Sequence, residues 1–459
     1  MNISQTMNKL EQLRHLFDAY QISAYLVPQT DEFQGEHIAP YAQRLHWLTG
    51  FTGTAGLAVV TKYKAALFVD ARYILQAQNE VSLSDFEVIN ARSPKMQTWL
   101  EENVKDGLIG YDPWLHTRAE QERYKGFHLK ETPNLIDLLW KDQPAFPTRQ
   151  FVVHPLEYAG QPHSSKVKDF ISYLEKNDID AYILTDTTSI AWLLNVRGSD
   201  IPYTPVTLAY SIIHRDKVVV YANEKQSPEV LKHFNSQIQL RPFERFLADL
   251  QNLSGLKIGF SPEITPCKIL ETLSKNNILK VQEDPCISKR AIKNPIEQQG
   301  MRHAHLRDSV ALTKFMYWFE NFPCPDEYSA VEKLVELRRQ QPLFQGLSFE
   351  TIAAFGENGA VVHYRPNARL TRAIDKDGLL LVDSGGQYLD GTTDVTRVLL
   401  KGTPQEEHIR HYSLVLKGYI NLSRAKFPCG VSGPQLDVLA RMPLWQEGKD
   451  FAHATGHGV

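Results

Sequence analysis

The sequence predicts a multidomain protein of mixed α/β class, with two related N-terminal α/β domains followed by a third domain of a different kind. Its 459 residues are enough for about three domains, and 42% hydrophobic residues supply sizeable cores. A pattern of amphipathic helices and short apolar strands occurs twice before residue 290. Beyond that point the pattern changes to a long helix, a run of strands and two more helices.

The two N-terminal copies are predicted from four matches that occur in the same order. An apolar strand follows a helix pattern, then comes a tryptophan segment, a strand hairpin, and a strand that ends at proline. In the first copy these are residues 24–27, 47–50, 56–69 and 107–113; in the second they are 181–184, 192–195, 209–221 and 255–262. Four ordered matches indicate a duplication. With residues 143–148 as a linker, we predict domains at 1–147, 148–290 and 291–459.

The third domain is predicted to open with a long helix. Asn294 can cap it, Pro295 suits the first helical turn, and Glu297 is placed to complete a capping box. A second helix is expected at about 329–339, strands up to about 400, and helices at about 405–426 and 432–446.

Composition narrows the function classes. A net charge of −3 does not predict nucleic-acid binding. No apolar run approaches the ~20 residues of a membrane helix, and no signal peptide is visible. The four cysteines form no CxxC pair, which favours reduced thiols in a reducing compartment. We therefore expect a cytoplasmic protein, either an enzyme or a binding scaffold.

Two aspartates stand out as candidate metal ligands. Asp383 ends a strand of four apolar residues, and Asp394 lies in a β-prone run after an Asp-Gly turn. An aspartate beside glycine is usually a turn residue, but Asp394 lies between Thr393 and Val395, where aspartate is disfavoured. Buried carboxylates on neighbouring strands repel unless a cation lies between them. The pair therefore predicts a divalent metal site.

Three histidines complete the candidate site. His457 lies between two glycines, and His453 precedes it by one helical turn's spacing. Oxygen ligands with one imidazole suit Mn²⁺, Co²⁺ or Zn²⁺. His363 follows two valines in what we predict to be an apolar strand. Alone it could equally be a hydrogen-bonded core histidine, but beside the acids it becomes a candidate to stabilise a transition state.

These segments resemble a known family. Residues 382–385, 392–397 and 453–459 are similar to the aminopeptidase P (Xaa-Pro aminopeptidase) branch of the pita-bread metallopeptidases. The three-domain cytosolic form is the most similar, since it carries two related domains before the catalytic one. Residues 195–200 and 289–294 also resemble that form. The resemblance spans nearly the whole chain and implies a pita-bread fold for the third domain.

The resemblance implies specific roles. Asp383, Asp394 and His457 match three of the family's five metal-ligand positions, with Asp394 bridging two divalent ions, and Mn²⁺ is the expected metal, with Zn²⁺ or Co²⁺ as alternatives. His363 and His453 match histidines that contact substrate and stabilise the tetrahedral intermediate. The implied reaction is release of the N-terminal residue from peptides with proline second, by attack of a hydroxide activated by two metal ions. We also expect a homodimer.

Two alternative functions remain, and the sequence departs from the family pattern in one respect. A prolidase-type dipeptidase uses the same ligands but carries one N-terminal domain, and a non-catalytic pita-bread binding module typically lacks the ligands. The family's two glutamate ligands and a further histidine follow the glycine-flanked histidine, and these positions lie beyond Val459. We therefore expect the catalytic domain to be incomplete, and the 459-residue chain to bind metal weakly and show little or no turnover.

Overall fold

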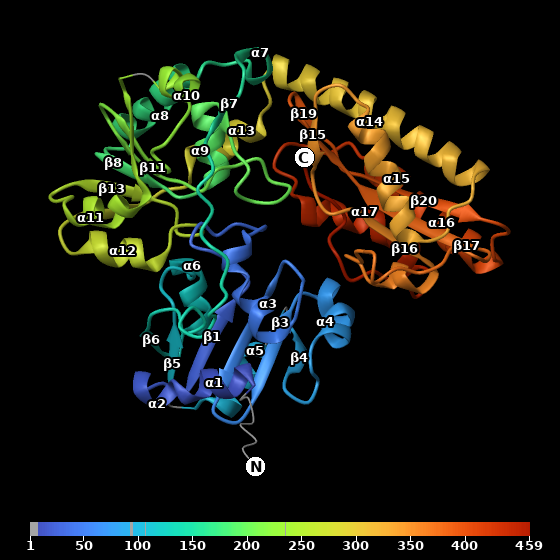
Figure 1. Cartoon of the computed structure of the whole chain (residues 1–459), viewed down its shortest axis with the longest axis horizontal. Helices are drawn as coiled ribbons and strands as arrows, with labels where there is room; N and C mark the ends of the chain where they lie inside the picture. Colours follow the sequence, from blue (N-terminus) through green and yellow to red (C-terminus); the bar gives the residue numbers. More distant parts are fainter. Residues whose placement is uncertain (1–7, 92–94, 106, 235) are drawn as a thin grey trace. The chain divides into compact units, whose positions relative to one another are not determined.

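The computed structural model describes residues 8–91, 95–105, 107–234 and 236–459 (Figure 1). Its contacts form two compact units. The first unit comprises Met1–Asp70, Gln76–His303 and Leu389–Gly391, and the second comprises Ala71–Leu75, Ala304–Tyr388 and Thr392–Val459. The domain limits expected from the sequence, at residues 147 and 290, remain predictions.

The first part of the first unit is built on a six-stranded sheet in the order β4-β3-β2-β1-β5-β6. Its strands are β1 (Ala24–Pro28), β2 (Gly56–Thr61), β3 (Ala65–Val69), β4 (Glu87–Asn90), β5 (Leu108–Tyr111) and β6 (His128–Glu131). The helices are α1 (Lys9–His15), α2 (Phe17–Tyr20), α3 (Arg44–Thr49), α4 (Ile74–Glu80), α5 (Lys95–Asn103) and α6 (Arg118–Gln121).

A second six-stranded sheet follows, in the order β12-β11-β10-β8-β13-β14. Its strands are β8 (Ala181–Leu184), β10 (Tyr210–His214), β11 (Val218–Ala222), β12 (Ile238–Pro242), β13 (Lys257–Phe260) and β14 (Ile278–Val281). The helices are α7 (Leu156–Ala159), α8 (His163–Lys176), α9 (Thr187–Leu194), α10 (Pro228–His233), α11 (Phe246–Gln251), α12 (Cys267–Ser274) and α13 (Pro285–Ala291). A small ribbon pairs β7 (Val152–Val153) with β9 (Val196–Arg197).

The predicted duplication is confirmed by the topology of the two sheets. In each, the first strand pairs antiparallel with one arm of the hairpin and parallel with the strand that ends at proline. Tyr25 lies opposite Gly110 in the first sheet, and Tyr182 lies opposite Gly259 in the second. A Cβ atom would lie 3.1 Å from the Tyr25 ring at Gly110 and 2.6 Å from the Tyr182 ring at Gly259. Both copies therefore need glycine where the tyrosine ring crosses the neighbouring strand.

The matched tryptophans also occupy equivalent places. Trp47 lies in α3, which ends at Gly50 with a φ of 82°, and Trp192 lies in α9, which ends at Asn195 with a φ of 51°. Left-handed residues of this kind commonly end helices, and glycine and asparagine adopt the conformation at the lowest cost. The two segments aligned in the sequence are therefore the same structural element, a helix ending between the first strand and the hairpin.

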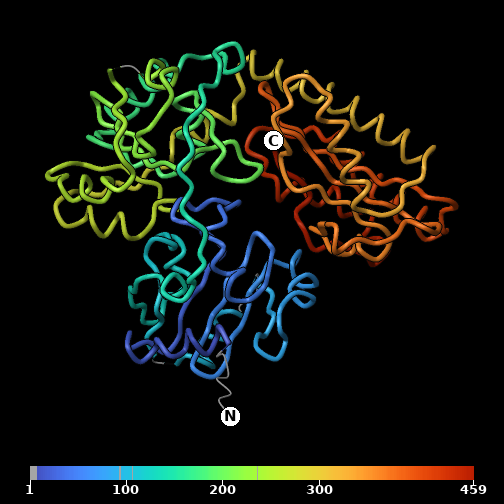
Figure 2. The backbone as a smooth tube through the Cα atoms, viewed as in Figure 1, coloured from blue at the N-terminus to red at the C-terminus, as the bar shows by residue number. Residues whose placement is uncertain are grey.

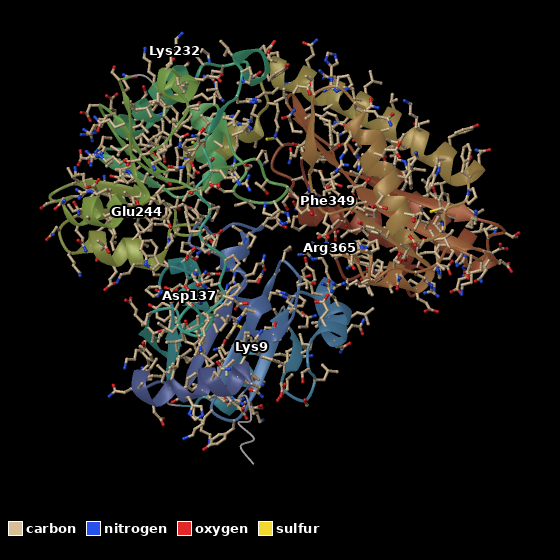
Figure 3. The ribbon with its side chains drawn as sticks, viewed as in Figure 1. Lys9, Asp137, Lys232, Glu244, Phe349 and Arg365 are labelled. Carbon is tan, nitrogen blue, oxygen red and sulfur yellow. The ribbon has the colours of Figure 1, made fainter. Side chains whose placement is uncertain are left out.

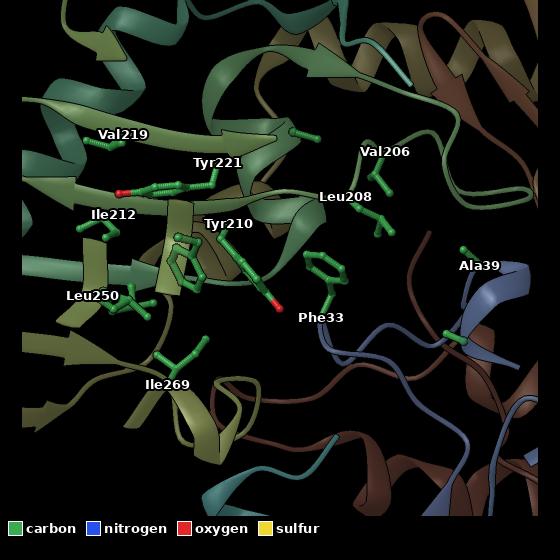
Figure 4. Close-up of a cluster of buried hydrophobic side chains, with 14 of the residues drawn as sticks. Phe33, Ala39, Val206, Leu208, Tyr210, Ile212, Val219, Tyr221, Leu250 and Ile269 are labelled. Atoms are coloured by element: carbon green, nitrogen blue, oxygen red, sulfur yellow. The ribbon is translucent and has the colours of Figure 1, made fainter. Parts of the chain in front are cut away.

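The two halves of the first unit share a hydrophobic cluster. Figure 2 shows residues 143–150 as an extended stretch, without helix or strand, that joins them. Phe33 from the first half stacks on Tyr210 from the second, with ring centroids 4.7 Å apart (Figure 4). The carboxylate of Asp200 accepts hydrogen bonds from the Arg149 and Leu208 amides, which fixes the end of the linker. The 195–200 segment noted in the sequence thus has a structural role.

The second unit contains two three-stranded sheets, in the orders β16-β17-β20 and β15-β18-β19. The strands are β15 (Phe344–Leu347), β16 (Ile352–Phe355), β17 (Gly378–Ser384), β18 (Gly386–Tyr388), β19 (Gly391–Thr392) and β20 (Val395–Lys401). The helices are α14 (Pro295–Asn321), which begins in the first unit, α15 (Glu327–Arg339), α16 (Glu406–Ser423) and α17 (Gly433–Trp445).

The predicted start of α14 is confirmed by its capping contacts. The Asn294 side chain accepts a hydrogen bond from the Glu297 amide at 3.0 Å, and the Glu297 carboxylate accepts one from the Asn294 amide at 2.9 Å. Further along, Phe315 and Phe319 pack with Leu334 of α15 and Leu380 of β17 in one buried cluster. Within the described residues, no helix has the length and apolar character to cross a membrane.

Candidate metal centre

Asp383 and Asp394 lie at the same end of two paired strands of the second unit, β17 and β20. Asp383 is the sixth residue of β17, and Asp394 immediately precedes β20, rather than lying within a strand as expected. The strands are antiparallel, with Asp383 opposite Thr396. The Thr396 hydroxyl donates to the Asp383 carboxylate at 2.8 Å. The apolar strand therefore delivers its one carboxylate to the start of the neighbouring strand, beside Asp394.

The electrostatics of the pair favour a bound cation. Burial raises the pKa of Asp383, the hydrogen bond from Thr396 opposes this, and the nearby Asp394 carboxylate raises it further. Two carboxylates this close cannot both be charged at low cost unless positive charge compensates them. A proton can supply that charge, and so can a metal ion.

His457 joins this pair through Asp394. Its Nε2 atom lies 3.4 Å from an Asp394 carboxylate oxygen, and its Nδ1 atom lies 2.9 Å from the Gly458 carbonyl. The imidazole is 72% exposed, whereas the Asp394 side chain is 27% exposed. The structure thus places both Asp383 and His457 near Asp394, and the exposed His457 side chain is able to turn toward a ligand.

Arg441 of α17 positions the segment that carries the two C-terminal histidines. Its guanidinium donates to the carbonyls of Phe451 at 2.6 Å and His453 at 2.7 Å, and pairs with the carboxylates of Asp437 and Asp450. The His453 ring stacks on Phe451 at 4.6 Å. The sequence reasoning missed Arg441, although its spacing of four residues from Asp437 is a visible helix-pair signal.

His363 lies in a turn, which corrects the strand predicted for it. The turn follows a short 3-10 helix, η5 (Gly356–Ala360). Two valines before His363 favour a strand by propensity, but the side chain of the next residue decides the local conformation. The Tyr364 hydroxyl donates at 2.8 Å to the buried Glu327 carboxylate, which draws the turn against α15. The substrate-contact roles of His363 and His453 remain predictions.

Glu327 was not identified from the sequence, yet it organises the loop around His363. It is fully buried and accepts hydrogen bonds from the Phe355 and Arg372 amides, the Asn358 side chain and the Tyr364 hydroxyl. Burial and this carboxylate raise the pKa of Tyr364, so its phenol stays protonated and keeps donating. Glu327 is the first residue of a helix, and the groups that donate to it lie up to 45 residues away in the sequence. No local sequence pattern could have revealed these hydrogen bonds.

The chemical types of these three side chains suit a divalent cation, but their positions in the structure do not form a complete metal site. Two carboxylates and an imidazole are suitable ligands for Mn²⁺, Zn²⁺ or Co²⁺. Among residues 8–91, 95–105, 107–234 and 236–459, however, no three His, Cys, Asp or Glu side chains form a group that could hold an ion. Metal binding by these residues therefore requires His457 to move or additional ligands to take part.

Comparison with known families defines the class of the protein. The profile described as Creatinase/Prolidase N-terminal domain matches twice, at residues 9–139 and 142–297. The profile described as Metallopeptidase family M24 matches residues 299–459. The two sheets of the first unit are thus two creatinase-like domains. Strand β17, which carries Asp383, and strand β20, which Asp394 precedes, belong to a pita-bread metallopeptidase domain, as the resemblance implied.

Individual relatives narrow this class. A probable Xaa-Pro aminopeptidase P of Aspergillus fumigatus is 40% identical over all of this chain and 74% of its own length. That of Talaromyces marneffei is 38% identical over the same shares. The crystal structure of a Caenorhabditis elegans X-prolyl aminopeptidase, described as a cytosolic enzyme with a di-nuclear active site, matches with a TM-score of 0.92 at 35% identity. It covers 98% of this chain and 79% of its own. The chain belongs to the Xaa-Pro aminopeptidase branch of metallopeptidase family M24.

Proposed function

We propose that this protein releases the N-terminal residue from peptides that carry proline in the second position. The observation that carries the proposal is the proximity of Asp383 and His457 to Asp394, in a chain that is 40% identical to an Xaa-Pro aminopeptidase P along its entire length. The two N-terminal domain matches favour this activity over the prolidase alternative. The cytosolic description of the Caenorhabditis elegans enzyme supports a cytoplasmic location.

In this proposal Asp383, Asp394 and His457 hold part of a site for two divalent ions, with Mn²⁺ expected and Zn²⁺ or Co²⁺ as alternatives. When bound, such ions lower the pKa of water and polarise a carbonyl group. Asp394 would be the ligand shared by the ions, because it lies beside both Asp383 and His457. The di-nuclear site of the Caenorhabditis elegans enzyme supports a requirement for two ions.

The chain's histidines have the remaining roles. We assign His363 and His453 to substrate contact, where an imidazole N–H can donate to the oxygen that becomes negative as the amide carbon turns tetrahedral. Glu327 and Arg441 are positioning residues, because they hold the segments that carry these histidines. Homodimer formation remains an expectation.

The test compares two proteins on matched peptides. One is the 459-residue chain, and the other is a chimera that joins this chain to the part of the Caenorhabditis elegans enzyme that the match does not cover. Each is incubated with Ala-Pro-Ala and Ala-Ala-Ala, with Mn²⁺ or with a chelator. The chimera should release alanine from Ala-Pro-Ala only with Mn²⁺. The 459-residue chain should show little turnover, because its described donors form no closed metal group.

Two results would contradict the proposal. Release of alanine in the presence of the chelator would show that the reaction does not require a metal ion. Equal release from Ala-Ala-Ala would remove the preference for proline. A folding control, far-ultraviolet circular dichroism of both proteins, ensures that absence of turnover is not absence of structure.

A further inference from the structure

A cavity of about 270 Å³ lies within the first unit. Five segments line it: the loop after β1, the loop after β5, the linker, the start of β10, and residues 243–247, which lead into α11. Five of its lining residues are aromatic, namely Trp114, Phe146, Tyr210, Phe243 and Phe246. A cavity of this size holds a small molecule or a side chain rather than a few waters.

The aromatic walls are held in place by their own packing. The Tyr210 ring lies 4.3 Å from that of Phe246, 5.2 Å from that of Phe243 and 6.3 Å from that of Trp114. Phe146 lies 5.0 Å from Phe243. The Tyr210 hydroxyl donates to the Glu32 backbone carbonyl at 2.9 Å, so its orientation is also fixed. The cavity is therefore preformed, which lowers the entropic cost of binding.

The charge around the cavity is negative. Glu32 lines it, and its carboxylate accepts hydrogen bonds from Arg44 at 3.0 Å and Tyr41 at 2.7 Å. Arg44 is shared with Asp137, to which it donates at 2.7 and 2.9 Å. The adjacent Asp31 is fully buried, and its Oδ2 atom has no hydrogen-bond partner among the described residues. Burial raises the pKa of Asp31 to about 7, so the negative charge beside Arg44 comes mainly from Glu32 and Asp137.

A second acid lies at the cavity, and no lining residue is basic among those described. Glu244 contributes to the lining and has an exposed side chain (Figure 3). Aromatic faces together with carboxylates attract cations, because both the ring quadrupole and the acid charge favour positive charge. An anionic ligand would be repelled here, and a neutral apolar ligand would leave the acids without a role.

We propose that this cavity binds a small quaternary ammonium group. Each Glu32 carboxylate oxygen already accepts a hydrogen bond, and the aromatic walls offer no strong acceptors. A primary ammonium could pair with the Glu244 carboxylate, but its N–H donors that face the aromatic rings would lack partners, which is costly where water is excluded. A methylated ammonium carries charge but no N–H donor, so it gains the cation–π attraction without that penalty.

The test uses the wild-type chain and two ligands of nearly equal shape. Choline carries a trimethylammonium group, and dimethylbutanol has the same skeleton with carbon in place of the charged nitrogen. Isothermal titration should give one choline per chain, with dimethylbutanol binding about tenfold weaker or less tightly still. Equal affinity for the two ligands, or no choline binding, would overturn the proposal without reliance on any variant.

Matched variants then locate the site. Glu244→Gln removes one charge at the cavity, whereas Glu175→Gln removes one from an exposed position of α8. The first should weaken choline binding about threefold or more, and the second should leave it unchanged. Trp114→Leu should weaken it about fivefold or more, with circular dichroism to verify folding. Equal affinities for the two glutamine variants would place choline elsewhere and contradict the proposal.

Discussion

At the scale of single residues, side chains distant in sequence fix the loop that carries His363. Glu327 begins α15, yet its carboxylate serves donors between Phe355 and Arg372. A buried charge is tolerated only when its hydrogen-bonding capacity is filled, and here both oxygens are used. Glu327 therefore connects the stability of the second unit to the placement of a proposed substrate-binding histidine.

Glu327→Gln should loosen this loop. The amide turns one acceptor into a donor that faces other donors, so we expect a loss of about 2–4 kcal/mol in local stability. Hydrogen exchange across residues 355–372 should accelerate, while Glu332→Gln, on an exposed position of the same helix, should leave it unchanged. Unchanged exchange in the Glu327 variant would show that the backbone holds the loop without this carboxylate.

The sequence predicted that Asp383 and Asp394 lie close together, but it did not predict the residues around them; their role as metal ligands stays a prediction. Asp383 and Asp394 were identifiable because carboxylates are out of place in apolar, β-prone runs. His363 was assigned to a strand because propensity is a local property, whereas the bond from Tyr364 to Glu327 spans 37 residues. The Arg441 contacts were missed for the same reason, since they form only when the chain folds back after α17.

At the scale of elements, the duplicated sheets show how much a periodic pattern can predict. The hairpins, the capping box at Asn294 and the two last helices were all expected, because each depends on neighbours within a few residues. Strand order was expected only through the repeat itself. The close fit of Gly110 and Gly259 against tyrosine rings explains why glycine occurs at both matched positions.

Alanine at either glycine should destabilise its own sheet. A Cβ atom would lie 2.7 Å from an Ile22 methyl group at Gly110 and 2.6 Å from the Tyr182 ring at Gly259. We expect each substitution to cost about 1–3 kcal/mol, measured by denaturant unfolding. Gly346→Ala is the matched control, because nothing lies within 4 Å of its Cβ position. A loss of unfolding free energy no larger than that of the control would mean that the neighbouring side chains move aside freely.

At the scale of the whole molecule, buried neutral histidines predict sensitivity to acid. Burial lowers the pKa of His154 from 6.5 to about 3, with a smaller contribution from the charges of Arg197 and Lys166. Between these values the unfolded chain binds a proton that the folded chain does not. The contribution of neutral His154 to the free energy of unfolding is therefore complete above pH 6.5 and is lost as the pH falls toward about 3.

His154→Asn should reduce this dependence, because asparagine does not titrate. Unfolding measured at several pH values between 7 and about 4 should show the variant losing less stability than wild type, by on the order of 2 kcal/mol. If the unfolding free energy of the variant falls with pH as steeply as that of the wild type, other groups cause the acid sensitivity.

The central claim is that Asp383, Asp394 and His457 hold divalent metal. Crystals soaked in MnCl₂ and measured for anomalous scattering test it directly. We expect a manganese peak roughly 2–2.5 Å from carboxylate oxygens of Asp383 and Asp394, with His457 turned toward it. The peak should vanish in Asp394→Asn and persist in Asp375→Asn, an exposed position on the loop before β17. Manganese bound elsewhere in the second unit, with the two acids left unliganded, would contradict the account.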